Sequence, residues 1–247
     1  MKIAVLGMVG AASVVAAADA GFSGFVASVR TSGAYTIIDI FAGVTNASDK
    51  FLNVYNLTAS TTAAGGFYQQ AGLATKTWKP DAANFNSTRN SIDSFMTAGT
   101  YSGGAYGGEY YASTNTNGDP NFTGTSWNGT PASAAATTIP ALAGWYTGDP
   151  TSVDNTTESL AAVAGDRVNA SGAASANFGI WCAHLVISGN YTGGAAFPVI
   201  QWCGYVSIKD GVTGGTSQVS SGSFFCPAPG AIALLAVAGF LPRRRRH

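Results

Sequence analysis

Charge is the scarcest property of this 247-residue chain, because Asp, Glu, Lys and Arg make up only 10% of it, against about 25% in an average soluble domain. The region between the two ends, residues 21–226, has seven Lys or Arg against eleven Asp or Glu, a net charge of about −4. Proteins that bind nucleic acid need a basic face. We therefore expect no nucleic-acid partner.

Histidine and glutamate are almost absent, which limits acid–base chemistry. His184 is the only histidine before the final residue, so any Ser-His-Asp or Cys-His device must use it. Glu109 and Glu158 are the only glutamates, so a carboxylate pair for glycoside hydrolysis would have to draw on aspartates. We expect the protein not to be an enzyme. An uncharacterised hydrolase is the last of three functional hypotheses.

The chain is rich in apolar and small residues, and 46% of it is hydrophobic and 11% aromatic. Short β-branched and aromatic runs separated by Gly, Asn and Ser are typical of strands. Such runs occupy residues 22–30, 34–44, 51–58, 65–70, 91–97, 160–163, 178–188, 197–208 and 212–225. They predict an all-β protein, an antiparallel and jelly-roll-like β-sandwich over residues 21–226, with helices only at the two ends.

The N-terminus has the pattern of a secretory signal peptide. Met1-Lys2 precedes an apolar run, and Ala18-Asp19-Ala20 supplies small residues at a cleavage site. We expect residues 1–20 to form a signal helix that is removed after Ala20. A retained transmembrane anchor is the alternative.

The C-terminus, residues 227–247, has three parts. A short element (Pro227, Ala228, Pro229 and Gly230) precedes the apolar run 231–241, and four arginines follow (Arg243, Arg244, Arg245 and Arg246). As a helix the run would be under ~20 Å long, shorter than the roughly 30 Å hydrocarbon core, so it would insert only with help from its flanks. A buried or amphipathic helix is the alternative interpretation.

These three parts, in this order, resemble the PEP-CTERM sorting tail of bacterial surface proteins. Ala228 replaces the usual glutamate, which is similar to the Pro-Ala-Pro-Gly tails of planctomycete-type bacteria. The resemblance implies an exosortase-type membrane protease as partner, transient membrane insertion of the helix, and a mature protein that ends near Cys226. A eukaryotic lipid-anchor signal is the rival, although it should not end on arginines.

The first functional hypothesis follows from both ends of the chain. We expect an exported, non-enzymatic protein of the cell envelope, cell surface or extracellular matrix, with exopolysaccharide as a further candidate partner. The second hypothesis is a secreted carbohydrate-binding module. It would use aromatic residues of the Gly- and Asn-rich region 99–148, in particular Trp127, Trp145 and Tyr146. The alternative role of these rings is to fix long loops onto the sandwich.

Two strands of similar length, 178–188 and 197–208, are interpreted as a hairpin. Cys182 and Cys203 are then equidistant from the centre of the connecting loop and face each other, which permits a disulfide. Export also favours oxidation. A metal site that adds His184, and a pair of free thiols, are the two alternatives.

No cofactor is expected, and calcium is the one metal that the sequence leaves open. Residues 115–119, Asn-Thr-Asn-Gly-Asp, place oxygen ligands at alternate positions. Pro120 stands where a calcium loop would need glycine, and no glutamate closes the loop. A turn rich in Asn and Asp is the simpler interpretation.

Overall fold

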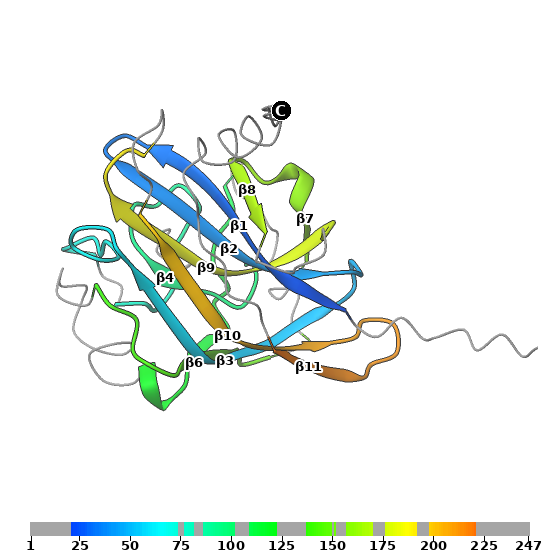
Figure 1. Cartoon of the computed structure of the whole chain (residues 1–247). Coiled ribbons are helices and arrows are strands. Elements are labelled where there is room, and N and C mark those ends of the chain that lie inside the picture. Colours follow the sequence, from blue (N-terminus) through cyan, green and yellow to red (C-terminus); the bar gives the residue numbers. More distant parts are fainter. Residues whose placement is uncertain are drawn as a thin grey trace, which may run out of the picture.

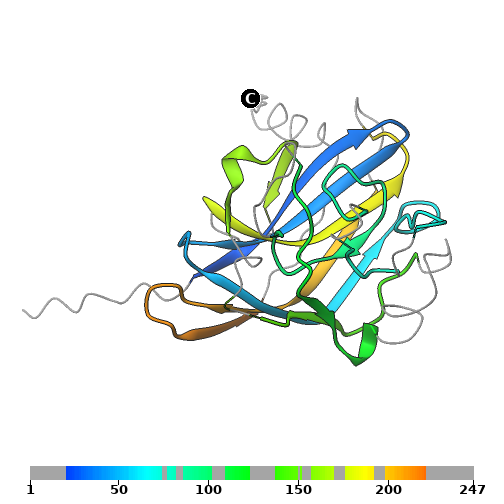
Figure 2. The same ribbon diagram turned by 180° about the vertical axis from the view of Figure 1, so that it is seen from behind.

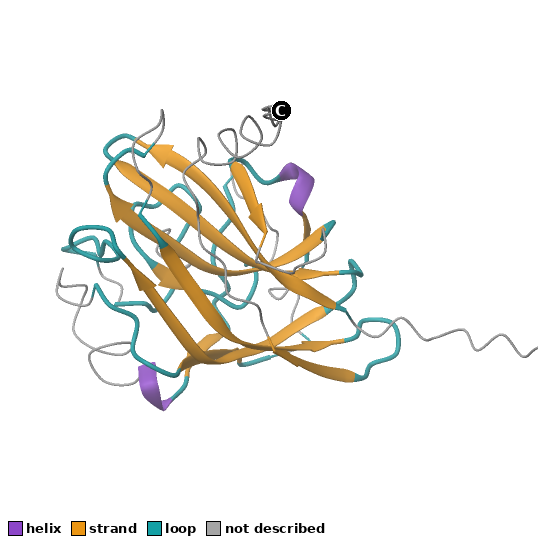
Figure 3. Cartoon of the chain, viewed as in Figure 1, coloured by secondary structure: helices purple, strands orange, loops and turns teal. Residues whose placement is uncertain are grey.

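A computed structural model gives the fold of the chain (Figure 1). It describes residues 21–73, 77–81, 86–101, 109–122, 137–149, 151, 157–169, 176–191 and 198–220, the last five by backbone only. Within these ranges the regular structure is nearly all strand, and Figure 3 shows only two short helical turns, η2 (Pro120–Phe122) and η3 (Leu160–Ala162). The all-β prediction is confirmed.

The strands form two antiparallel sheets. Sheet A has the order β4-β9-β2-β1-β8, and β7 also pairs with β9. Its strands are β1 (Phe22–Ser32), β2 (Tyr35–Val44), β4 (Phe95–Met96), β7 (Glu158–Ser159), β8 (Asp166–Asn169) and β9 (Phe178–Ser188). Sheet B has the order β11-β10-β3-β6-β5. Its strands are β3 (Lys50–Thr61), β5 (Thr116–Gly118), β6 (Ala143–Thr147), β10 (Ile200–Lys209) and β11 (Thr216–Ser220).

The two sheets pack face to face as a β-sandwich, and the two opposite views show the layers (Figures 1 and 2). One hydrophobic cluster fills the space between them and draws on both sheets, with Phe25, Ile38 and Leu185 from sheet A and Val54 and Trp202 from sheet B. The predicted β-sandwich is therefore present. Local sequence explains its longest strands, because β10 alternates buried and exposed residues along most of its length, and β2 and β9, which are covered on both faces, are mainly apolar.

The first three strands correspond closely to the predicted ones. β1 and β2 form a hairpin in which Ser32 pairs with Tyr35, and Gly33 takes a left-handed φ of 58° in the tight turn. The chain then crosses from sheet A to sheet B between β2 and β3.

The predicted hairpin of residues 178–188 and 197–208 is wrong, although both strands exist. β9 lies in sheet A between β2 and β4, whereas β10 lies in sheet B between β3 and β11. The connection between them therefore crosses the sandwich. Equal distance from a loop centre defines a hairpin only if the two strands share a sheet, and that depends on partners elsewhere in the chain.

In several weaker segments the structure differs from the secondary structure that the sequence predicts. Residues 160–162 are a 3₁₀ turn and not a strand, and only Phe95 and Met96 of the segment 91–97 are in a strand. The Gly- and Asn-rich region contributes β5 and β6, which were not predicted. β5 has little intrinsic β-propensity and is stabilised by pairing with β6, which in turn pairs with β3.

A third layer covers the outer face of sheet A. A second hydrophobic cluster lies there, with Val26, Phe41, Phe95 and Trp181 from the sheet and Ala112 from the covering chain. This layer also contacts the sheet through Arg89, whose main-chain oxygen accepts a hydrogen bond from the Arg30 guanidinium. Polar side chains of sheet A that would otherwise meet solvent are therefore enclosed.

Candidate functional site

A row of polar side chains crosses sheet A beneath this third layer. Ser28 on β1 pairs with Asp39 on β2, and Asp39 pairs with His184 on β9. His184 in turn pairs with Phe95 on β4. Directly paired residues lie on the same face of a sheet. The register therefore brings together residues more than 140 positions apart, on the face opposite the sandwich core.

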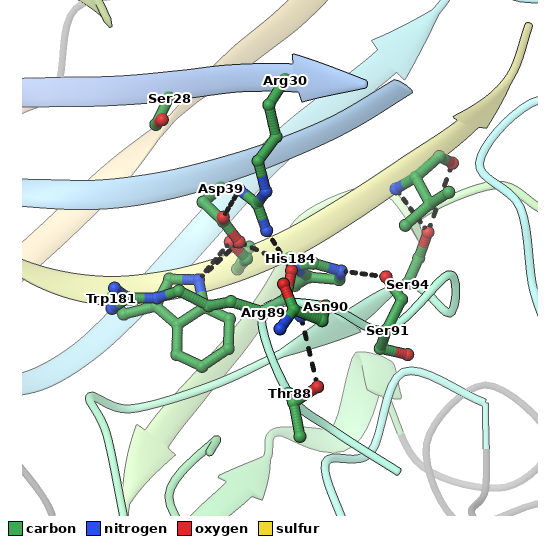
Figure 4. Close-up of polar contacts among 12 residues, drawn as sticks. Ser28, Arg30, Asp39, Thr88, Arg89, Asn90, Ser91, Ser94, Trp181 and His184 are labelled. Carbon is green, nitrogen blue, oxygen red and sulfur yellow. Dashed lines mark hydrogen bonds and ion pairs between the residues drawn. The ribbon is translucent and has the colours of Figure 1, made fainter. Parts of the chain in front are cut away.

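Asp39 is the centre of this network, which Figure 4 shows. One carboxylate oxygen, Oδ1, lies 2.6 Å from His184 Nδ1 and accepts a hydrogen bond from Trp181 Nε1 at 3.1 Å. The other, Oδ2, accepts from the guanidinium of Arg30. Asp39 and His184 are both fully buried. This arrangement is a charge cluster with almost every oxygen lone pair in use.

The charge state of Asp39 follows from opposing effects. Burial raises the pKa of its carboxyl group, but the charges of His184, Arg30 and Arg89 and the His184 hydrogen bond lower it more, from 3.8 to about 2. Asp39 is therefore a carboxylate at neutral pH.

Both ring nitrogens of His184 face acceptors. Nδ1 faces the Asp39 carboxylate, and Nε2 lies 2.9 Å from the main-chain oxygen of Ser91. A carboxylate and a carbonyl oxygen both only accept, so each ring nitrogen is placed to donate a hydrogen bond when it carries a proton. Phe95 stacks on it at 4.9 Å between ring centroids.

Arg89 extends the cluster on the side of the third layer. Its guanidinium pairs with Glu158 and lies over the rings of Tyr110 and Trp181, at 4.2 and 4.8 Å from their centroids. Its main-chain oxygen also accepts from Arg30. Arg89 thus links the covering segment to the sheet by charge, stacking and a main-chain contact.

This geometry serves structure better than catalysis. A Ser-His-Asp device needs a hydroxyl at the histidine nitrogen that does not face the aspartate. Here that nitrogen faces a main-chain oxygen, and the Ser28 hydroxyl donates to the Ala164 carbonyl instead. His184 is also fully enclosed. The described structure therefore offers a hydrolase no support at the one histidine that could serve it.

The network was missed from sequence, although two signals were present. Asp39 stands within the apolar run Ile37-Ile38-Asp39-Ile40-Phe41, and His184 within Trp181–Ile187. A charged residue in a strand covered on both faces needs a buried partner. Two such residues in separate strands are candidates to pair with each other.

The predicted disulfide between Cys182 and Cys203 is wrong. Both are free cysteines, and they lie on different sheets. Cys182 is buried in the sandwich core, where its thiol lies 3.2 Å from the Ile180 carbonyl oxygen and burial raises its pKa. Cys203 pairs with Thr58 on β3 and is exposed.

The alternative metal site at these cysteines is excluded by the same geometry. Cys182 faces the core between the sheets, whereas His184 faces the third layer. Among the residues that the structure describes, no group of three or more His, Cys, Asp or Glu is placed to hold a metal ion.

The stretch proposed for calcium is not a wrapping loop. Thr116–Gly118 is β5 and pairs with β6, so its main chain is extended. The Asp119 carboxylate follows the strand and accepts the Asn121 amide at 2.8 Å. The turn that the sequence favoured is therefore limited to the end of this stretch, at Asp119, and the residues before it form a strand.

The proposed glycan contacts have three different outcomes. Trp127 lies outside the described residues. Trp145 is fully buried between the sheets, and its Nε1 donates to the Thr97 carbonyl at 3.0 Å, so it is not a surface contact. Tyr146, the next residue along β6, points the other way and is 45% exposed.

Tyr146 belongs to an aromatic group that the sequence did not reveal. Tyr55 on β3 pairs with Tyr205 on β10, and their rings lie nearly parallel at 18° with centroids 5.3 Å apart. Tyr205 is 42% exposed. Tyr146 pairs with Asn53, two residues before Tyr55 on the same strand. We call Tyr55, Tyr205 and Tyr146 the tyrosine face, and it lies on the outer side of sheet B.

The predictions for the two ends of the chain concern residues outside the described ranges. They comprise the signal peptide with Ala18 and Ala20, Cys226 and the whole sorting tail. Within the described residues, no helix has the length and apolar character that crossing a bilayer requires.

Comparison with known proteins adds no relative. No protein-family model, curated protein or solved structure matches this chain.

Proposed function

We propose that the protein is an exported, non-enzymatic component of the cell envelope or extracellular matrix, sorted by an exosortase-type system. The observation that carries this proposal is the order of Pro-Ala-Pro-Gly, apolar run and four arginines at one end, opposite a leader-like segment at the other. The sandwich between them is the part that would remain outside the cell. Its one histidine within the described core is held in a charge cluster with no substrate access.

Localisation of truncated protein tests the sorting step. The full gene and a version lacking residues 227–247 are expressed in a bacterium with an exosortase, and envelope, medium and membrane fractions are compared. We expect the full protein to reach the envelope or medium in a shortened form. The truncated protein should be released without anchoring or processing.

A matched control separates the arginines from the rest of the tail. Replacement of Arg243–Arg246 by glutamine keeps the length and the apolar run but removes the charges that hold this end in the cytoplasm. It should give unprocessed or mislocalised protein. Identical location and mass for all three versions would refute the sorting proposal.

A second candidate function, carbohydrate binding, is supported by the tyrosine face. Aromatic rings at protein surfaces offer large, rigid contact area, and their negatively polarised faces attract the C–H groups of a sugar ring. Tyr55 and Tyr205 provide two nearly parallel rings, and Tyr146 provides a third on the neighbouring strand. Such a site would bind exopolysaccharide in the matrix to which the protein is sorted.

Affinity electrophoresis in gels that contain a soluble polysaccharide tests this function. We expect the exported protein to be retarded, and a Tyr55→Ala/Tyr205→Ala variant to run as it does in a plain gel. Tyr101→Ala is the matched control, since Tyr101 is 44% exposed and its segment is hydrogen-bonded to Tyr111 and, through Gly99, to Trp181 of sheet A. Equal retardation of both variants would refute the role of the tyrosine face.

A further inference from the structure

Two lysines face each other at one end of the tyrosine face. Lys50 begins β3 and Lys209 ends β10, and the two are directly paired in the antiparallel ladder. Like charges in direct cross-strand pairs destabilise a sheet. Among the described residues the ion pairs are Arg30–Asp39, Arg89–Glu158 and His184–Asp39, so neither lysine has a counter-ion there.

The lysine pair lines a surface hollow of about 420 Å³. Hydroxyl residues Ser48, Thr151 and Thr213 also line it, which adds hydrogen-bonding groups around the two charges. The loop after β10 forms one wall and approaches Ser48 so closely that a Cβ on Gly211 would lie 2.0 Å from the Ser48 main-chain oxygen. The wall is therefore fixed by close backbone packing.

Two carboxylates near the hollow are already engaged. Asp210 lines it, but its Oδ1 accepts the amides of Val212 and Thr213 at 2.7 and 3.0 Å, and these hydrogen bonds lower its pKa. Asp49 is fully buried and accepts the amides of Asn46 and Gly211. Both acids thus hold turns together. The Asp210 carboxylate offsets part of the lysine charge, and the rest of that positive charge is available to an incoming anion.

The hollow and the tyrosine face lie on the same side of the same two strands. On the outer side of β10 the residues in order are Lys209, Ser207 and Tyr205, paired with Lys50, Asn53 and Tyr55 of β3. Four residues of strand separate the lysine pair from the tyrosine pair, roughly 13 Å at about 3.3 Å per residue. An extended ligand along the strands would meet charge at one end and aromatic rings at the other.

Asn53 and Ser207, which pair between the lysines and the tyrosines, have unused hydrogen-bonding capacity. The side-chain oxygens of Asn53 and Ser207 are buried and have no hydrogen-bond partner in the structure. Ser207 is only 2% exposed. Buried polar atoms without partners are rare and costly. Both oxygens are enclosed in this structure, so the contacts proposed for a ligand lie at the two ends of the strip, at the lysines and the tyrosines.

We propose that this strip along β3 and β10 binds an acidic polysaccharide, with a sugar ring at Tyr55 and Tyr205 and a carboxylate or sulfate group between Lys50 and Lys209. This inference rests on the proposed carbohydrate-binding function and specifies its ligand class. A neutral glycan would leave the repulsion between the lysines unrelieved. Nucleic acid fits poorly, because its phosphates demand many cations and the region 21–226 carries about −4.

Three polysaccharides distinguish the ligand class from the binding function itself. Dextran is neutral, dextran sulfate adds sulfate to the same backbone, and polygalacturonate carries carboxylates. We expect exported protein to bind at least one of the two anionic polymers at least tenfold more tightly than dextran. That preference should disappear in 0.5 M NaCl, where the Debye length shrinks below about 5 Å.

Variants then assign the preference to the lysine pair. Lys50→Met/Lys209→Met should lose at least tenfold in affinity for the anionic polymer and leave any binding to dextran unchanged. Without ligand, the same variant should melt at an equal or higher temperature, since the repulsion is gone. Lys79→Met is the matched control, because Lys79 is exposed and lies in a different part of the chain.

The outcomes are separable. Equal affinity for dextran and for both anionic polymers, or wild-type affinity in the Lys50→Met/Lys209→Met variant, overturns the acidic ligand and leaves carbohydrate binding intact. Equal losses in the Lys79→Met control show diffuse charge attraction and also overturn it. No binding to any of the three polymers, in a protein whose melting curve shows it folded, overturns this inference. If the protein also failed to bind a wider set of neutral polymers, the carbohydrate-binding proposal would be refuted.

Discussion

Asp39 is the single side chain on which most of the buried charge depends. It contacts both His184 and Arg30 and also accepts from the Trp181 indole. Buried ion pairs add little net stability compared with a well-packed apolar core, but removal of one partner leaves an uncompensated charge. The cluster thus makes the packing of the third layer on sheet A specific to one arrangement.

Asp39→Asn should therefore be among the most damaging single substitutions in the chain. It keeps the size of the side chain but removes the buried negative charge that Arg30 and His184 contact, at a cost of about 3–5 kcal/mol in the free energy of unfolding. Denaturant unfolding of purified protein measures the loss. Asp166→Asn, at an exposed position of the edge strand β8, should change stability by no more than about 0.5 kcal/mol. Equal effects would mean that the cluster is not a stabilising unit.

Asp93 is a buried carboxyl group whose pKa shifts in the opposite direction to that of Asp39. Burial raises its pKa from 3.8 to about 6, although the Gln70 and Ser94 amides and the charge of His184 lower it in part. The folded protein therefore binds this proton more tightly than the unfolded chain. The stabilising effect is fully present below pH 3.8 and is lost as the pH rises through 6.

Asp93→Asn should remove the loss of stability that ionisation of Asp93 causes as the pH rises. The amide oxygen can still accept from the Gln70 amide, now 2.7 Å from Asp93 Oδ1, and it carries no charge to bury. We expect the variant to be more stable than wild type by up to roughly 3 kcal/mol at pH 8, since one pKa unit corresponds to about 1.4 kcal/mol, and nearly equal at pH 4. Denaturant midpoints at the two pH values provide the measurement. An equal stability difference between variant and wild type at pH 4 and pH 8 would show that packing, and not ionisation of Asp93, causes the effect.

At the scale of elements, the decisive feature is that β9 and β10 lie in different sheets. Each has the length and composition of a central strand, and each was located within three residues from sequence. Their partners are β2 and β3, which lie far earlier in the chain. Strand identity depends on local alternation of residues, whereas pairing depends on which distant apolar faces complete the core.

The reactivity of the two cysteines tests this arrangement of β9 and β10 in solution. Cys203 is exposed on β10, so iodoacetamide should modify it in the native exported protein. Cys182 is buried and its pKa is raised, so it should react only after unfolding. Peptide mapping by mass spectrometry distinguishes the two sites. A peptide pair that links Cys182 to Cys203 in untreated protein would contradict the sandwich and restore the hairpin.

At the scale of the whole molecule, ionisation of several buried carboxyl groups sets how stability depends on pH. Burial also raises the pKa of Glu158 despite the charge of Arg89, and the pKa of Asp49 despite hydrogen bonds from two amides. Asp93, Glu158 and Asp49 therefore all favour folding at lower pH. Asp39 acts in the other direction, because its pKa is lowered to about 2 and its contribution is lost as the pH falls below 3.8.

The opposing shifts predict a stability maximum in weak acid. Below about pH 3.8 the Asp39 contribution, roughly 2 kcal/mol, is progressively lost, and towards pH 6 and above the cost of ionising Asp93 appears. We expect the melting temperature to be highest between about pH 4 and 5 and lower at both pH 2 and pH 8. Calorimetry across this range measures it. A maximum at pH 8 would show that the buried acids are not protonated as their surroundings indicate.

Sequence by itself determined the all-β class, the sandwich architecture and the positions of β1, β2, β3, β9 and β10, because residue alternation and turn-forming residues are local properties. It also supplied the sorting hypothesis, which rests on the order of residues at the ends of the chain. Only the tertiary structure decided which strands pair, and with that the surroundings of each proposed site residue within the described part of the chain. It separated Cys182 from Cys203, buried Trp145 and joined Asp39 to His184. It also aligned Tyr55 and Lys50 with Tyr205 and Lys209. The physical reason is that a side chain's surroundings in a sheet come from strands that are distant in sequence, and a shift of one residue in register moves it to the opposite face.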